Sequence, residues 1–125
     1  MKKLLFLFMI IGIGIGATAQ EKQKSDMTTV LTKQIFKDSI TGHDVQLIDV
    51  RTPEEFSKGH IKNAKNIDFL EPGTFTEKFQ KLKKDRPLYI YCRSGNRSGQ
   101  ASKKLEQMGF QEIYDLDGGY LNWQK

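Results

Sequence analysis

Cysteine is nearly absent from this sequence: Cys92 is the only one among 125 residues. A single thiol excludes an intramolecular disulfide, and it excludes dithiol exchange within one chain, which needs a second cysteine. Cys92 is therefore either a small buried apolar side chain, the common fate of a free cysteine, or a reactive group. The residues around it distinguish these two possibilities.

Strong charge and metal-ligand clusters are also lacking. The formal net charge is +5, a mild excess that does not indicate nucleic-acid binding. The lysines at positions 78, 81, 83 and 84 fall on the solvent side of a predicted helix. One cysteine and two distant histidines give no metal-ligand spacing, and no nucleotide-binding or other cofactor motif occurs. We expect no nucleic-acid partner, no metal and no cofactor.

No apolar run reaches the length of a membrane-spanning helix. Residues 4–16 are uncharged and apolar, and they fall short of the roughly 20 residues that a spanning helix needs. Lys2 and Lys3 precede this run and Ala17-Thr18-Ala19 follows it, which is the pattern of a secretory signal peptide. An uncleaved N-terminal anchor is the alternative.

This pattern predicts three segments: a signal peptide over residues 1–19, a polar tether over 20–28 and one folded domain over 29–125. Cleavage after Ala19 would leave 106 residues, enough for a single hydrophobic core and too few for two domains. We expect an exported protein, periplasmic or secreted, with no membrane association after cleavage.

Helix and strand patterns alternate along the predicted domain. Strand patterns occur at residues 45–50, 64–67, 88–91 and 112–116. Helical spacing occurs at residues 31–40, 53–58, 74–82 and 98–108, and a short tail helix carries Trp123. This alternation indicates the α/β class, with a mainly parallel sheet covered by helices on both faces.

Two helix starts carry capping signals. Thr52 and Glu55 flank Pro53 in a capping box, and Gly59 is placed to end the helix that follows. Thr74 and Glu77 form a second predicted capping box. Glu55 thus has a structural role available, worth on the order of 1 kcal/mol to its helix.

The segment Cys92-Arg93-Ser94-Gly95-Asn96-Arg97-Ser98 joins a buried strand to a helix. In a parallel sheet, ligands bind at such loops beyond the carboxyl ends of the strands. Gly95 and Asn96 tolerate left-handed dihedrals, so successive backbone N–H groups can curl inward. These donors, the helix dipole and the two arginines favour a thiolate at Cys92 and attract an anion.

A simpler interpretation treats these residues separately. Arg93 and Arg97 would be surface charges, Ser98 a helix cap and Cys92 the packed last residue of its strand. Each part is reasonable alone, but their coincidence within seven residues at a strand-to-helix junction favours a functional thiol.

The chain resembles the single-domain rhodaneses, or thiosulfate sulfurtransferases, over about the whole predicted domain. The family's ordered motifs are Asp49-Val50-Arg51, Glu55-Phe56, Gly59-His60-Ile61 with Ala64, the loop from Cys92 to Ser98, and Gly118-Gly119 with Trp123. Lys62-Asn63 stands where the family commonly has Pro-Gly, and Asp68 stands where a proline often occurs. These departures concern a turn rather than the cysteine loop.

The resemblance implies a rhodanese-like three-layer α/β/α fold with a sheet of about five strands. It also implies an enzyme in which the Cys92 thiolate takes the outer sulfur of thiosulfate, or of a similar small anionic donor, and passes it from a persulfide to an acceptor. Arg93 is the candidate for donor contact, and Ser94, Gly95, Asn96, Arg97 and Ser98 complete the predicted binding loop. Arg97 either contacts the donor or braces the loop through a carboxylate.

Three further residues are assigned to the support of this loop. Asp49 and Arg51 support the loop from the side in the family, and a local turn network is their alternative role. Glu55 is scaffold, with a second role in holding an arginine. We expect a monomer whose acceptor, a small thiol or a protein, is not defined by the sequence.

Two other classes of function stay open. Cysteine phosphatases and arsenate reductases also hold a thiolate in an amide-lined loop, but they typically place five residues between cysteine and arginine, and Cys92 and Arg97 have four between them. A non-catalytic binding module or a persulfide carrier is the other class, and sequence does not separate a carrier from a sulfurtransferase.

Overall fold

The computed structural model describes residues 27–125, which form five strands and five helices. The predicted signal peptide and most of the predicted tether lie outside the described residues. The strands are β1 (Thr28–Leu31), β2 (Gln46–Asp49), β3 (Lys65–Asn66), β4 (Leu88–Tyr91) and β5 (Ile113–Leu116). The helices are α2 (Lys33–Ile40), α3 (Pro53–Lys58), α4 (Pro72–Phe79), α5 (Asn96–Gln107) and α6 (Gly119–Trp123). Within this part of the chain, no helix has the length and apolarity to cross a membrane.

All strands pair in parallel, in the order β1-β5-β4-β2-β3. The predicted parallel sheet of about five strands is therefore confirmed. β4 is the central strand, so both of its edges are hydrogen-bonded to neighbours. Because the strands are parallel, the loops after β2, β4 and β5 all emerge at the same edge of the sheet, where parallel sheets bind ligands.

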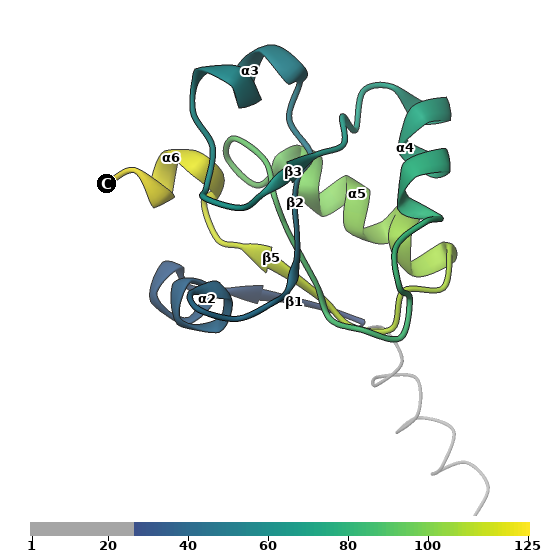
Figure 1. Cartoon of the computed structure of the whole chain (residues 1–125), viewed down its shortest axis with the longest axis horizontal. Helices are drawn as coiled ribbons and strands as arrows, with labels where there is room; N and C mark the ends of the chain where they lie inside the picture. Colours follow the sequence, from purple (N-terminus) through teal and green to yellow (C-terminus); the bar gives the residue numbers. More distant parts are fainter. Residues whose placement is uncertain (1–26) are drawn as a thin grey trace, which may run out of the picture.

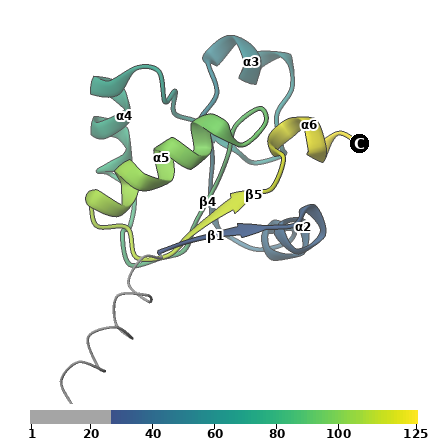
Figure 2. The same ribbon diagram turned by 180° about the vertical axis from the view of Figure 1, so that it is seen from behind.

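Helices cover both faces of the sheet, which confirms the three-layer prediction. Figures 1 and 2 show α4 and α5 together on one side and α2 and α6 on the other. The core is accordingly split into two clusters, one containing Phe75, Phe79 and Leu105 and the other containing Phe36 and Tyr91. α3 lies at the carboxyl edge, near the loop that follows β4 (Figure 1).

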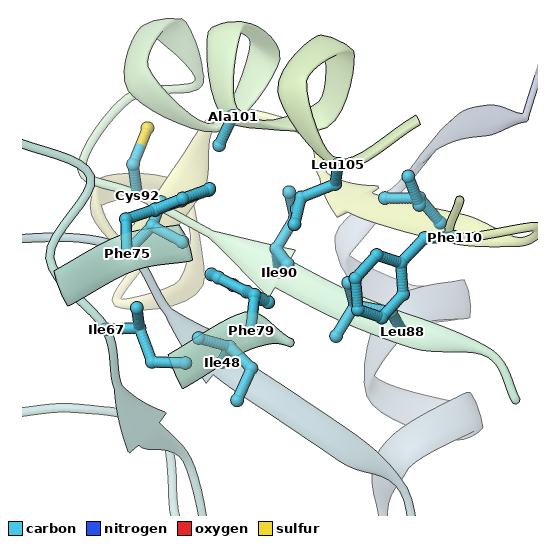
Figure 3. Packing of buried hydrophobic residues seen from close by; sticks show 12 residues of the cluster. Ile48, Ile67, Phe75, Phe79, Leu88, Ile90, Cys92, Ala101, Leu105 and Phe110 are labelled. Carbon is cyan, nitrogen blue, oxygen red and sulfur yellow. The ribbon is translucent and has the colours of Figure 1, made fainter. Parts of the chain in front are cut away.

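The central strand shows how the sequence specifies these layers. Leu88 and Ile90 belong to the cluster under α4 and α5, whereas Tyr89 and Tyr91 pack with the cluster under α2 and α6. This alternation follows from the two-residue period of a strand. Cys92 continues it and lies at the end of the first cluster, as Figure 3 shows.

The first predicted capping box forms as expected. The Thr52 hydroxyl accepts the Glu55 N–H at 3.2 Å, and the Glu55 carboxylate accepts the Thr52 N–H at 3.0 Å. Pro53 occupies the first turn and Gly59 caps the end of α3. This short helix is therefore fixed by local signals rather than by burial, since none of its residues is fully buried.

Two predictions about elements were wrong. Residues 28–31 form strand β1, whereas the sequence placed Leu31 at the start of a helix. Helix α4 begins at Pro72 rather than at a Thr74–Glu77 capping box, and Glu71 at its N-cap makes no side-chain capping bond. Proline is favoured at the first helical position because its fixed φ suits the helix and its missing N–H leaves no donor unpaired.

Candidate active site

Cys92 directly follows the central strand, at the point where the chain turns into α5. Gly95 is the N-cap of this helix and has φ of +111°, a left-handed conformation that glycine adopts without steric cost. The space around it would accept a Cβ, so the backbone angle rather than crowding selects glycine here. The Cys92 side chain points from the end of β4 toward the first turn of α5 (Figure 3).

The thiol of Cys92 is enclosed and hydrogen-bonded. The residue is 1% exposed, and its sulfur accepts the Gly95 N–H at an N–S distance of 3.1 Å. The thiol in turn donates to the Ser98 hydroxyl oxygen at 3.4 Å. Ser98 is fully buried in the first turn of α5, so it contacts the sulfur rather than capping the helix. The loop thus offers a donor to negative charge on the sulfur.

Arg97 is held by Glu55 from α3. Its guanidinium makes two parallel bonds to the carboxylate, Nη1 to Oε1 at 2.8 Å and Nη2 to Oε2 at 3.0 Å. These bonds are the main reason that the pKa of Glu55 falls to about 2. The pKa of Arg97 is raised, first by Glu55 and to a smaller degree by the nearby Cys92. Of the two roles considered for Arg97, the structure therefore shows the brace.

A second buried pair lies beside the loop. Arg51 binds Asp49 through Nη2–Oδ2 at 2.7 Å, and their side chains are 6% and 0% exposed. The same guanidinium donates to the Gly59 carbonyl at 2.7 Å and lies 4.4 Å from the centre of the Tyr120 ring. The pair is therefore more than a local turn, because it joins the end of β2 to the end of α3 and to α6.

The start of α6 fastens the cysteine loop from the other side. The Tyr120 N–H donates to the Cys92 carbonyl at 2.8 Å, and the Leu121 N–H donates to the Arg93 carbonyl at 3.1 Å. Gly119, at φ of +60°, lies so close that a Cβ would stand 2.5 Å from the Arg93 carbonyl carbon and oxygen. Only glycine fits this approach, so Gly118-Gly119 is part of the site and not simply a turn.

The remaining predicted loop residues face outward. Arg93, Ser94 and Asn96 are exposed, and the Asn96 side chain bonds to Gln100 on the helix surface at 3.1 Å. The structure therefore brings together Cys92, Gly95 and Ser98, with Arg97 nearby, and leaves the other three at the surface. A cavity of about 220 Å³ lies beside them, lined by Arg51, Glu55, Lys58, Gly59, Arg93, Tyr120, Leu121 and Gln124.

A larger cavity of about 740 Å³ lies elsewhere, where residues 40–47 meet residues 60–65 and Trp123. It contains both histidines, His43 and His60, and no residue of the cysteine loop. The larger volume does not make it the active site, because its lining does not contain the Cys92 thiol or any other residue of the cysteine loop. The small cavity is the better candidate, since it adjoins the loop and has three cationic side chains in its lining.

Sequence reasoning left three residues of this site without a role. Gly118-Gly119 was identified as a family motif, but Gly119 and Tyr120 contact the loop only because α6 folds back over the end of β4, a contact between distant segments that no local pattern signals. Asp115 was simply part of a predicted strand, yet its side chain is buried beneath α5. A charged residue within an otherwise apolar strand was the one available signal. Among the described residues, no group of three or more His, Cys, Asp or Glu side chains could hold a metal.

Residues 32–125 match the rhodanese-like domain family. The uncharacterized protein YqhL of Bacillus subtilis is 42% identical over 78 residues, covering 62% of this chain and 60% of that protein. The thiosulfate sulfurtransferase GlpE of Pseudomonas aeruginosa is 35% identical over 79 residues, covering 63% of this chain and 69% of that protein. The chain thus spans less than two thirds of the Bacillus relative.

Solved structures show the same fold. The crystal structure of a rhodanese-like domain protein from Staphylococcus aureus superposes with a TM-score of 0.66 at 31% identity, covering 76% of this chain and 90% of that one. The matched residues include the central strand β4 and the cysteine loop that follows it, and the parallel sheet agrees with the fold of this family. This chain belongs to the rhodanese-like domain family.

Proposed function

We propose that the protein is a sulfurtransferase that carries a sulfane sulfur as a persulfide on Cys92. The observation that carries this proposal is the enclosed sulfur, which receives the Gly95 N–H at 3.1 Å and lies near the Arg97 cation. Such a site stabilises negative charge on sulfur. Membership of a family that includes proteins named sulfurtransferases supports the same chemistry.

The reaction proceeds in two balanced steps. The Cys92 thiolate attacks the outer sulfur of thiosulfate, a new S–S bond forms, and the donor's own S–S bond breaks so that sulfite leaves with its electron pair. A nucleophile such as cyanide then takes the terminal sulfur, and Cys92 departs as the thiolate. No external oxidant or reductant is needed, because the sulfur moves at the same oxidation level.

The surroundings favour a small anionic donor. Because Cys92 is only 1% exposed, a bulky substrate cannot reach the sulfur, whereas a small anion needs only a local movement of the exposed residues Arg93 and Ser94. Arg93 and Lys58 line the adjacent cavity without an ion pair in the described part of the chain, whereas Arg51 and Glu55 in the same lining are paired with Asp49 and Arg97, so this entrance has a positive potential. Thiosulfate, a dianion of this size, is the donor we propose.

The phosphatase alternative is less well supported by the geometry. A phosphatase needs a free guanidinium to bind the phosphoryl oxygens, and Arg97 already gives both parallel bonds to Glu55. A persulfide needs charge stabilisation near the sulfur and no second bidentate contact. The brace therefore favours sulfur transfer.

We also propose that the protein acts after export, as a monomer. The pattern over residues 1–19 supports export, and the lone thiol would then work in an oxidising compartment where it needs a supply of reduced acceptor. The N-terminal residue of the protein purified from its own cells tests the predicted cleavage after Ala19. An intact N-terminus would contradict cleavage and favour the anchor.

The test of the function is intact mass after thiosulfate treatment, with and without cyanide, for the wild type and Cys92→Ser. We expect the wild type to gain the mass of one sulfur atom, cyanide to remove it, and the variant to gain none. A wild type that stays unloaded while its thiol is free would contradict the proposal. Loading without turnover toward cyanide or small thiols would instead identify a persulfide carrier.

A further inference from the structure

The cavity of about 740 Å³ has no part in the proposed reaction. Its volume falls within the range of about 300–1,000 Å³ that is usual for small-molecule sites. Its lining contains no residue of the cysteine loop and no member of the two ion pairs that support that loop. A hollow of this size beside the core, with a lining of mixed character, raises the question of what it binds.

The floor of the cavity is apolar. Ile40, Leu47 and Ile61 line it and are at most 9% exposed. They come from the end of α2, from β2 and from the segment after α3, so three parts of the chain meet there. Val45 and Trp123, both half-buried, line the same cavity and pack against the same core cluster. This surface favours the apolar body of a ligand, because binding would remove both from water.

Trp123 gives the floor an aromatic side. Its ring meets the buried Phe36 ring edge-on, with centroids 6.4 Å apart and an angle of 77° between the planes. This contact holds the indole against the core while the residue also lines the cavity. Because aromatic rings favour further aromatic partners in stacked or edge-to-face geometry, a flat aromatic body suits this position.

Backbone hydrogen bonds fix both walls of the cavity. On one wall, the Ile61 N–H donates to the hydroxyl of the buried Tyr91 at 3.0 Å, and the Ala64 N–H donates to the Ile61 carbonyl at 3.0 Å. On the other wall, Arg86 Nη2 donates to the Asp44 carbonyl at 2.9 Å. A cavity held in this way is formed before the ligand arrives, so little ordering opposes binding.

The charges at the rim favour an anion. Lys62 and Lys65 are exposed, both line the cavity, and neither forms an ion pair with another described residue. Asn63, between them in the sequence, has a left-handed φ of +72°, which asparagine tolerates better than most residues. The lining holds one carboxylate, that of Asp44, against these two cations. The excess of positive charge attracts a negatively charged group.

We propose that this cavity binds a small organic acid with a flat apolar body, aromatic for preference, and one carboxylate or sulfonate group. The body lies on the apolar floor beside Trp123, and the acidic group lies near Lys62 and Lys65. This binding function is separate from sulfur transfer and does not require Cys92.

The alternative is a hollow that holds only water, or one that takes up any apolar molecule regardless of charge. Two dyes with the same aromatic body separate these cases. Anilinonaphthalene sulfonate carries one sulfonate, and N-phenyl-1-naphthylamine is the same molecule without it. If the lysines recognise an anion, their removal weakens binding of the first dye and leaves binding of the second unchanged.

The experiment titrates the full chain with each dye and follows the dye's fluorescence. We expect the sulfonate dye to bind saturably, with one molecule per chain. The position is read by heteronuclear NMR from the indole N–H of Trp123, which gives a single signal because the chain has one tryptophan. This signal should shift in proportion to the bound dye, since the indole belongs to the cavity.

Four substitutions at exposed positions test the role of charge. Lys62→Gln and Lys65→Gln should each weaken binding of the sulfonate dye by about threefold, and together by about tenfold, as for partly exposed ion pairs. Asp44→Asn should strengthen it by about twofold, because the opposing carboxylate is removed. Lys103→Gln, on the exposed surface of α5 and outside the lining, should leave it unchanged.

Three results would overturn the proposal. They are the absence of saturable binding of the sulfonate dye, binding that leaves the Trp123 signal in place, and an affinity that does not respond to the two lysines. An equal loss of affinity for both dyes in the lysine variants also contradicts it, because that loss would reflect damage to the cavity rather than a missing charge.

This test is independent of the sulfur chemistry. Intact mass reads the Cys92 thiol, and the dye titration reads a cavity that contains no residue of the cysteine loop. A protein that never loads sulfur from thiosulfate could still bind the dye, and an empty cavity would leave the conclusion about the persulfide untouched.

Discussion

Glu55→Gln tests whether the bond between α3 and the cysteine loop holds the site together. The change keeps the shape of the side chain and an oxygen that can accept the Thr52 N–H, and it removes the charge that holds Arg97. The two residues are 42 positions apart, so their bond is tertiary and is lost when the chain unfolds.

The magnitude follows from the pKa of Glu55, which is lowered from 4.5 to about 2, chiefly by Arg97. At about 1.4 kcal/mol per pH unit, this difference sets an upper limit of about 3.5 kcal/mol on the stabilisation at neutral pH. The two side chains are 21% and 27% exposed, and solvent screening reduces the value. We expect Glu55→Gln to lower the free energy of unfolding by about 1–2 kcal/mol at pH 7.

The pH dependence has a definite sign. A carboxylate whose folded pKa is lowered stabilises the fold fully above its unfolded value of 4.5, and this stabilisation is lost as the pH falls through about 2. Urea unfolding followed by circular dichroism at pH 7 and at pH 3 should therefore show a smaller difference between wild type and variant at the lower pH.

Glu54→Gln is the matched control, because Glu54 is exposed in the same first turn of α3 and forms no ion pair in the described part of the chain. It should cost only a few tenths of a kcal/mol through the helix dipole. Equal effects of the two substitutions, or a Glu55→Gln difference that does not shrink at pH 3, would refute the reasoning.

Two further predictions concern the other supports of the loop. Gly119→Ala should lower the free energy of unfolding by about 2–4 kcal/mol and impair sulfur loading, because its Cβ would stand 2.5 Å from backbone atoms of Arg93. Gly73→Ala is the control: a Cβ there would have nothing within 4 Å, so this variant should be neutral or slightly stabilising in thermal unfolding. Asp115→Asn should stabilise the fold at pH 7 by up to about 3 kcal/mol. The pKa of Asp115 in the folded protein is about 6, above its ordinary value of 3.8, so the wild type loses stability as the pH rises from 3.8 through 6. Urea unfolding at pH 4 and pH 7 measures this gain, and a variant that is less stable at both values would contradict it.

Local signals in the sequence were sufficient for much of the architecture. The buried run at Leu88–Tyr91, the capping box at Thr52 and Glu55, and the alternation of strands with helices each depend on neighbouring residues, so they predicted the α/β class and the place of Cys92 after a strand. The position of Gly95 at a strand-to-helix junction likewise predicted the turn of the loop, because a left-handed residue was needed there.

Errors arose where a pattern was short or ambiguous. β1 has only four residues, and it is stabilised by pairing with β5. Thr28 pairs with Ile113, which lies 85 positions later in the sequence. Leu31 and Ile35 also fit a helical spacing, so the local pattern favoured the wrong element. A strand at the edge of a sheet gains its partner only from the folded chain.

The contacts of the site were decided by tertiary structure. The sequence alone predicted that Cys92 is a nucleophile in an anion-binding loop, and it left two alternative roles for Arg97. Only the approach of α3 to α5 places the Glu55 carboxylate on Arg97, and only the return of α6 over β4 demands glycine at position 119. Asp115 is polar in a strand pattern, but its pairing with Ile90 of the central strand places it in the interior of the sheet and not in solvent. Such pairings join residues far apart in the chain, and so no local pattern encodes them.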